Sequence, residues 1–306
     1  MALTTDPVEP LPPAAAPPKG RSLWSDARRR FLRNRAATVS LVVLALIAVF
    51  AFGGGLVAQY ERDAIDFTLI GINATQGAPS FETGHFFGTD QEGRDLFART
   101  VQGTRLSLLI GVVGSLVAVV VGTLYGAIAG YVGGRVDSAM MRIVDVLLSI
   151  PFMFVLILLL VMFGRSLTML FIGIGLISWL SMARIARGQT LSIKNKEFVE
   201  AAIATGVRPL TIILRHVVPN LAGVVVVYAT LLIPEMIIYE SFISFLGLGV
   251  QEPNTSLGAL ISRGAAQLGN GVPWQLGFPL FFFVAMLFAF YFVGDGLRDA
   301  LDPKDR

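Results

Sequence analysis

The side chains that could carry enzyme chemistry are few in this sequence. Its 306 residues include no cysteine and only two histidines, His85 and His216. The lack of cysteine excludes a thiolate nucleophile, a disulfide framework and a cysteine-ligated zinc site, and two distant histidines make no metal motif. No Gly-Lys dipeptide occurs, so a Walker A loop is excluded, and the HExxH and GxSxG motifs are also missing. If the protein moves a solute against a gradient, ions or another subunit must supply the energy.

One hydrophilic segment, residues 184–216, carries an ordered pattern of acidic and small side chains. Residues 197–205 are good helix formers, Gly206 can end that helix in the left-handed conformation, and Pro209 suits the first turn of a second helix. A short helix with small surface residues fits a groove on a partner protein; the alternative is a solvated loop helix. The residues that carry this pattern are Glu197, Glu200, Ala201, Ala202, Gly206 and Pro219.

Two further groups of charged residues are candidates for a role in structure or binding. Arg142 and Asp145 are three residues apart, so they can pair on one helical face inside an apolar run. Such an intramembrane pair is a functional hypothesis, with mutual charge satisfaction as the structural alternative. Asp90 and Arg94 lie in a turn with Asp95, where they can bond to one another and to backbone amides. We expect this turn to be structural or to contact a receptor.

Two acidic residues follow Pro219 within a long apolar run. If the run is helical, Glu235 and Glu240 lie ~25 Å beyond Pro219, which places them near the outer end of a membrane-spanning segment. Either carboxylate can meet an ammonium group of a solute in an outward-facing vestibule. The alternative is that each holds a helix end against a neighbouring helix.

The composition indicates an integral membrane protein. Hydrophobic residues make up 54% of the chain and charged residues 15%, whereas soluble domains carry about 25% charge. Six apolar runs are long enough to span a membrane, since about 20 residues are needed; they fall at 36–60, within 106–134, 136–164, 166–183, about 217–245, and within 264–294 starting near Trp274. The net charge of +3 does not indicate nucleic-acid binding, because the basic residues are distributed by membrane side.

The distribution of lysine and arginine predicts the orientation. With the N-terminus inside, 18 basic residues fall in inner segments and six in outer ones, so both termini are expected to be cytoplasmic. Residues 1–21 are rich in proline and alanine and are expected to form a disordered tail. Residues 22–35 have the pattern of an amphipathic helix on the membrane surface, or of an ordinary basic flank. Residues 61–104 form an outer segment, and residues 105–300 form a core with five further spans.

The inner-loop pattern resembles the EAA motif of ABC importer permeases. Its Glu-Ala-Ala, later glycine and final proline fall on Glu200, Ala201, Ala202, Gly206 and Pro219. Further blocks, FGTDQEGRD at 87–95 and ESFISFLGLG at 240–249, resemble those of peptide-importer permeases. With the two ends of the chain, residues 20–31 and 294–306, they are similar to the OppC type of oligopeptide permease. This type belongs to the OppBC/DppBC subfamily of the binding-protein-dependent transport permeases.

This resemblance implies an all-α integral membrane protein with six transmembrane helices and the type I, MetI-like permease fold. It further implies a non-catalytic subunit in the bacterial inner membrane, coupled through residues 184–216 to an ATPase. The implied partners are a second permease of OppB type, two ATPases of OppD/OppF type, a periplasmic peptide-binding protein of OppA type, and membrane lipid. The chain itself would hold no cofactor, and its partner ATPases would bind ATP and Mg²⁺.

Three alternatives stay open at this point. The shared blocks do not encode the substrate, so a related importer for dipeptides, nickel complexes, glutathione or antimicrobial peptides fits the same motifs. A proton-coupled secondary transporter would need a carboxylate relay through the membrane, where this sequence has few acids. A membrane-embedded hydrolase would need a nucleophile and a base, and neither constellation is visible.

Overall fold

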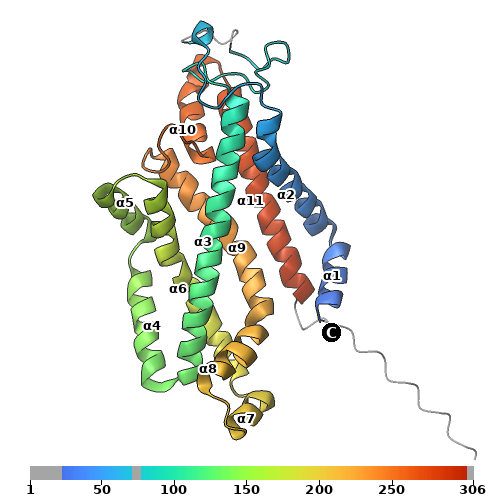
Figure 1. The fold of residues 1–306 in the computed structure, drawn as a ribbon, viewed down its shortest axis with the longest axis vertical. Coiled ribbons are helices and arrows are strands. Elements are labelled where there is room, and N and C mark those ends of the chain that lie inside the picture. Colours follow the sequence, from blue (N-terminus) through green and yellow to red (C-terminus); the bar gives the residue numbers. More distant parts are fainter. Residues whose placement is uncertain (1–22, 71–76, 302–306) are drawn as a thin grey trace, which may run out of the picture.

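The computed structural model describes residues 23–70 and 77–301, and the regular elements in these parts are helices (Figure 1). The expected tail at 1–21 lies outside the described residues. The helices are α1 Leu23–Arg33, α2 Arg35–Gly53, α3 Leu96–Val132, α4 Gly134–Ser149, α5 Phe152–Phe163, α6 Leu167–Ile193, α7 Glu197–Ala204, α8 Pro209–Ile212, α9 Val218–Phe245, α10 Leu257–Gln267 and α11 Trp274–Leu301. A π turn, Ile213–Val217, joins α8 to α9.

The helices run between two ends of an elongated molecule. Figure 1 shows α7 at one end, here called the α7 end, and the segment between α2 and α3 at the other, here called the loop end. By length and composition, the described residues contain five helices able to cross a membrane: Arg35–Leu56, Leu96–Val132, Leu167–Ile193, Pro209–Phe245 and Trp274–Leu301. The bent pair of α4 and α5 makes a sixth candidate.

The third expected span, 136–164, is not one continuous helix. It consists of α4 and α5, which meet at an angle of 78°. The break lies at Pro151, and Ile150 before it has the extended ψ of 126° that a following proline favours. The expected third span therefore corresponds to two helices joined by a sharp bend.

Two other spans are longer than the apolar runs that predicted them. α3 begins at Leu96, so the last part of the expected outer segment 61–104 is helical. Its start is set by Asp95, whose Oδ2 accepts a hydrogen bond from the backbone N–H of Ala98 at 2.7 Å. α6 continues to Ile193, ten residues beyond the end predicted from charge alone.

Close packing of α3 against α6 forms the centre of the molecule. Gly122, Gly126 and Gly130 lie on the contact face of α3. A Cβ atom at Gly122 would lie 2.5 Å from the Trp179 carbonyl oxygen, and one at Gly126 would lie even closer to that of Ala183. Small residues of this kind let the backbones of membrane helices approach closely.

The α1 helix packs on protein as well as facing outward. Ala27 and Phe31 are buried and form a cluster with Val293 and Ala300 of α11. The surface helix expected at 22–35 therefore uses part of its apolar face to cover the end of α11. Figure 1 shows α1 beside that end of α11.

Candidate functional sites

The segment around α7 has the local structure that its sequence predicted. The helix begins at Glu197, and Gly206 has a φ of +75°. The backbone N–H groups of Gly206 and Val207 donate to Ile203 O at 2.9 Å and Ala202 O at 3.1 Å. This is the Schellman arrangement, which ends a helix and turns the chain. Pro209 then begins α8, and Pro219 lies in the first turn of α9.

The two adjacent alanines of α7 have different environments. Ala202 is buried with Val199 in a cluster that includes Ala127 of α3 and Ala186 of α6. Ala201 is exposed, as are Glu197 and Glu200. The expectation that Ala201 and Ala202 share an outward docking face was therefore wrong for Ala202, which anchors α7 to the rest of the protein.

Large apolar side chains are exposed beside α7. Phe198, Ile203, Leu210 and Leu214, here called the α7 patch, are all exposed, Ile203 by 55% and Leu210 by 61%. Phe198 and Ile203 lie on the two flanks of the buried pair Val199 and Ala202, and exposed apolar side chains among charged residues are typical of a protein-interaction site. Sequence reasoning missed these residues, because the spacing of apolar residues does not show which of them pack on the rest of the protein.

At the loop end, Asp90 and Arg94 form the compact turn that the sequence predicted. Asp90 Oδ1 accepts hydrogen bonds from the backbone N–H groups of Glu92 at 3.0 Å and Arg94 at 2.9 Å. The Arg94 Nε donates to Asp90 Oδ2 at 2.8 Å. Burial raises the pKa of Asp90, although the Arg94 amide and the charges of Arg94 and Arg99 act in the opposite direction. Asp95 bonds to His85 Nδ1 at 2.9 Å instead of joining this turn.

Glu252 connects this turn to a distant part of the chain. Its carboxylate accepts from Arg94 Nη1 at 3.0 Å and Arg99 Nη2 at 2.9 Å, and it also contacts Arg263. Burial raises the pKa of Glu252, but the hydrogen bonds and charges of Arg99 and Arg263 outweigh burial and leave that pKa below its ordinary value. Sequence reasoning missed Glu252, because no local pattern marks a contact across more than 150 residues.

Glu240 is not in a vestibule. It is fully buried, and its carboxylate accepts hydrogen bonds from Ser107 at 2.8 Å, Ser244 at 2.7 Å and Ser241 at 3.2 Å. Ser107 Oγ also accepts from the backbone N–H of Leu257, at the start of α10. The carboxylate therefore holds α3, α9 and α10 together, as the structural alternative expected, since a buried carboxylate needs such donors.

Glu235 is accessible, in contrast to Glu240. It is partly exposed, and its Oε1 accepts a hydrogen bond from the Tyr239 hydroxyl at 2.6 Å. The Tyr239 ring lies 4.4 Å from the Phe152 ring of α5, measured between centroids. The Glu235 carboxylate therefore keeps one oxygen without a described partner on a partly exposed face of α9.

The expected pair of Arg142 and Asp145 is not formed. Asp145 Oδ1 instead accepts from Arg184 Nη2 of α6 at 2.7 Å, and both of these side chains are more than half exposed. Val144 is buried against α6, and this packing turns the adjacent Asp145 towards Arg184. The bridge therefore joins two helices instead of satisfying charges within one.

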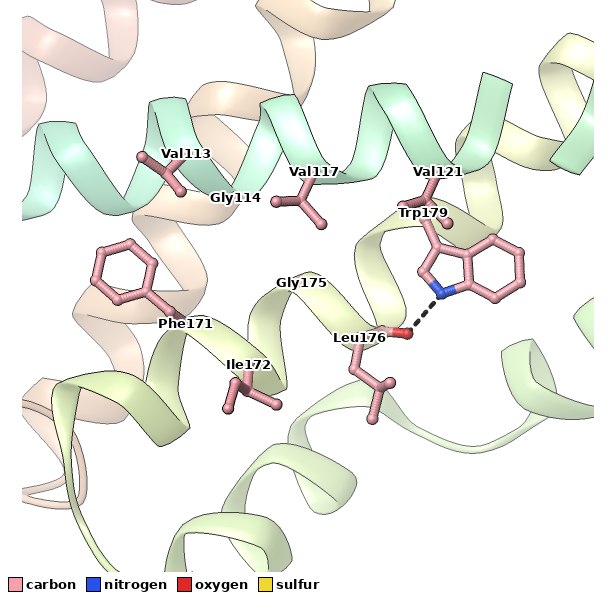
Figure 2. Close-up of a pocket in the computed structure, with 9 residues that line it drawn as sticks. All are labelled: Val113, Gly114, Val117, Val121, Phe171, Ile172, Gly175, Leu176 and Trp179. Carbon is pink, nitrogen blue, oxygen red and sulfur yellow. Dashed lines mark hydrogen bonds between the residues drawn. The ribbon is translucent and has the colours of Figure 1, made fainter. Parts of the chain in front are cut away.

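An open apolar groove lies between α3 and α6 (Figure 2). Its volume is about 450 Å³, and one wall carries Val113, Val117 and Val121 while Phe171 and Trp179 lie on the other. The indole N–H of Trp179 donates to Leu176 O at 2.8 Å, as Figure 2 shows. With no titratable lining residue, this groove can only take apolar surface. Across residues 23–70 and 77–301, no cluster of three potential metal ligands occurs either.

Two family models match the chain. One is described as "Binding-protein-dependent transport system inner membrane component" and matches residues 122–306. The other is described as "N-terminal TM domain of oligopeptide transport permease C" and matches residues 22–74. Together they leave only residues 1–21 and the stretch 75–121 without a match.

Curated relatives align over almost the whole length. The chain is 57% identical over 288 residues to the oligopeptide transport system permease protein OppC of Escherichia coli K12, covering 94% of this chain and 93% of that protein. It is 41% identical over 285 residues to the dipeptide transport system permease protein DppC of Bacillus subtilis, covering 93% and 87%. The inward-facing MetNI methionine ABC transporter shares the fold, with a TM-score of 0.53 at 22% identity over 66% of this chain and 96% of that one.

Proposed function

The chain belongs to the binding-protein-dependent transport permeases, in their oligopeptide permease C branch, and from this membership we propose that it is one of two permease subunits of an ATP-driven oligopeptide importer. A homologous OppB-type permease supplies the other half of the path. Two OppD/OppF-type ATPases bind ATP and Mg²⁺, and an OppA-type periplasmic protein delivers the peptide. This chain carries no catalytic step itself.

The observation that carries this proposal is the α7 patch. Phe198 and Ile203 are exposed on α7, which Val199 anchors to the rest of the protein, and Leu210 and Leu214 are exposed on the segment that follows it. Apolar anchors on a rigid helix, rimmed by charges, are suited to a groove on a partner. The partner proposed is an ATPase subunit, and the EAA residues Glu200, Ala201 and Gly206 position the patch.

The packing of α7 supports a coupling role. Ala202 and Val199 contact Ala127 of α3 and Ala186 of α6 through one buried cluster. A displacement of α7 by the ATPases would therefore move both central helices. In the proposed mechanism, closure of the ATPases on ATP opens the two permeases outward to receive the peptide, and ATP hydrolysis returns them inward.

The proposed setting is the bacterial inner membrane, with both termini and the α7 end in the cytoplasm. The excess of lysine and arginine at that side supports this orientation. The loop end then faces the periplasm, where the Asp90–Arg94 turn is within reach of the peptide-binding protein. Glu235 is the proposed acidic contact for a peptide ammonium, while Glu240 and the Asp145–Arg184 bridge hold helices in place.

Oligopeptides are the proposed cargo because the relative with 57% identity carries that name, and because the family model that matches residues 22–74 is that of the oligopeptide transport permease C. The test is uptake of labelled di- to pentapeptides into proteoliposomes containing the whole complex and its binding protein. We expect uptake of tri- to pentapeptides to require ATP and to persist when an ionophore collapses the proton gradient. Uptake that follows the proton gradient without ATP would contradict the proposal, and uptake restricted to dipeptides would correct the cargo.

A further inference from the structure

One face of α9 carries polar side chains along its whole length. Asn220, Val224, Tyr228, Leu231, Glu235 and Tyr239, here called the α9 stripe, recur at intervals of three or four residues and therefore share one helix face. All six are at least partly exposed. On the side of α9 away from the stripe, Ile237, Glu240 and Ser244 are buried.

The half of the stripe towards the α7 end forms the floor of a groove. The groove has a volume of about 510 Å³, with Gln189 of α6 on one side and Arg298 and Leu301 of α11 on the other. Figure 1 shows α9 between α6 and α11 in this part of the molecule. The groove thus combines apolar walls with amide, phenol and guanidinium groups, in contrast to the apolar groove of Figure 2.

The outward faces of α2 and α3 have a different composition. Every exposed position of α2 from Val39 to Phe52 is apolar, and so is every exposed position of α3 from Leu109 to Leu124. These faces match a hydrocarbon environment. The α9 stripe does not, because polar and ionisable side chains at membrane depth face protein or water rather than lipid.

The polar residues of the stripe lie at membrane depth. Helix α9, Val218–Phe245, has its midpoint between Leu231 and Leu232. At ~1.5 Å per residue, Tyr228 and Glu235 each lie ~5 Å from the middle, and Asn220 lies ~17 Å from it. Tyr228 and Glu235 therefore fall within a hydrocarbon layer about 30 Å thick, and Asn220 lies at its edge towards the α7 end.

Tyr228 and Glu235 each have hydrogen-bonding capacity that no described residue uses and that lipid chains could not satisfy. Tyr228 is 38% exposed, and its hydroxyl makes no hydrogen bond within residues 23–70 and 77–301. Glu235 uses one carboxylate oxygen for Tyr239. A hydroxyl or carboxylate that makes no hydrogen bond in hydrocarbon raises the free energy of the protein by roughly several kcal/mol. Water in a transmembrane passage would satisfy both.

We propose that the α9 stripe is this subunit's wall of the translocation path, where water and the backbone and ammonium groups of the passing peptide contact Asn220, Tyr228 and Glu235. The inference rests on the proposed function and identifies the face of the chain that lines the path. The second permease then lies across the groove and closes the path from the other side.

The absence of cysteine from the chain allows a direct test. Val224→Cys and Leu231→Cys are made in the stripe, and Leu116→Cys on the aliphatic face of α3 is the depth-matched control. The whole complex in proteoliposomes is treated with a charged, water-soluble methanethiosulfonate. We expect the stripe thiols to react about tenfold or more faster than the control thiol, since the thiolate forms in water. We also expect peptide, added with its binding protein, to slow the labelling of the stripe thiols.

A second measurement tests the carboxylate. With Leu231→Cys, one turn from Glu235, a cationic reagent should react several-fold faster than an anionic one. Glu235→Gln should bring this ratio close to that of an uncharged site, while Tyr239→Phe, which keeps the carboxylate, should preserve it. An unchanged ratio in Glu235→Gln would remove Glu235 from the path.

The outcomes separate the two proposals. Stripe thiols that react no faster than Leu116→Cys, in a complex that imports peptide, would show that lipid or the second permease covers α9; the inference then fails and the proposed function stands. A wild-type complex that imports no peptide would refute the proposed function, whereas fast labelling of the stripe would still show a water-filled passage.

Discussion

The guanidinium of Arg99, fully buried in the first turn of α3, donates from Nη2 to Glu252 Oε1 at 2.9 Å. This bond ties the start of α3 to the loop between α9 and α10. Arg94 and Arg263 contact the same carboxylate. The Glu252 carboxylate therefore contacts three arginines and stabilises the loop end of the molecule.

Removal of the Glu252 charge should loosen this end. Glu252→Gln leaves the buried Arg99 without its closest counter-charge, and we expect a loss of about 1–3 kcal/mol in stability. The value stays below that for a fully buried pair because the Glu252 side chain is 40% exposed. The control is Glu92→Gln, which removes an exposed partner of Arg94 and should change stability by about 0–1 kcal/mol. Thermal unfolding of the detergent-solubilised complex measures both; equal shifts would contradict the assignment.

The pKa of Glu252 also predicts a dependence on acidity. Its folded-state pKa lies below the ordinary value of 4.5, so the folded protein binds this proton less readily than the unfolded chain. The stabilisation is then complete above about pH 5 and is lost as the pH falls through the folded pKa. Asp90 opposes this trend, because its raised pKa favours the folded state at low pH. The difference in unfolding temperature between wild type and Glu252→Gln should therefore shrink below about pH 4.5; a constant difference would contradict the prediction.

Close packing at Gly126 should not tolerate a side chain. Gly126→Ala places a Cβ against the Ala183 backbone of α6, and we expect a loss of about 1–3 kcal/mol or failed assembly. Gly188→Ala is the control, since nothing lies within 4 Å of a Cβ there. Yield of assembled complex and its unfolding temperature compare the two variants. Similar behaviour of both would show that α3 and α6 can separate without loss.

The turn after α7 depends on backbone conformation alone. A Cβ at Gly206 meets nothing within 4 Å, but the φ of +75° remains. Gly206→Val should therefore strain the turn by about 1–2 kcal/mol and displace the α7 patch. We expect peptide-stimulated ATP hydrolysis and peptide uptake to fall together, with normal membrane insertion. Normal coupling in this variant would show that the turn does not position the ATPase contact.

The α7 patch itself can be tested by one charge. Ile203→Glu should weaken docking of the ATPases, because it places a carboxylate in an apolar contact. Asn195→Glu adds the same charge at an exposed polar position of the loop and should leave docking intact. Co-purification of the ATPase subunits with each variant measures the effect. Loss of docking in both variants, or in neither, would place the contact elsewhere.

The sequence predicted the helical spans, the turn at Gly206 and the Asp90–Arg94 pairing, because hydrophobic runs, left-handed glycines and short-range pairs are local features. It predicted Ala202 on the wrong face, since helical spacing alone does not say which face packs on the rest of the protein. The contacts of Glu252 and Glu240 join residues more than 130 positions apart, and no local pattern encodes them. The proline at position 151 favours a break in the helix, but it lies within an uncharged run that predicts a single span.

α3 is an unbroken helix of 37 residues, which corresponds to a rod ~55 Å long. Its first turn holds Arg99 in the Glu252 cluster, and Ala127 near its other end contacts the buried side of α7. A rod of this length acts as a lever. If it pivots at one end, a tilt of about 10° carries the other end through about 10 Å. A tilt of α3 would thus carry motion between the α7 end and the loop end of the molecule, with no helix having to unfold or bend.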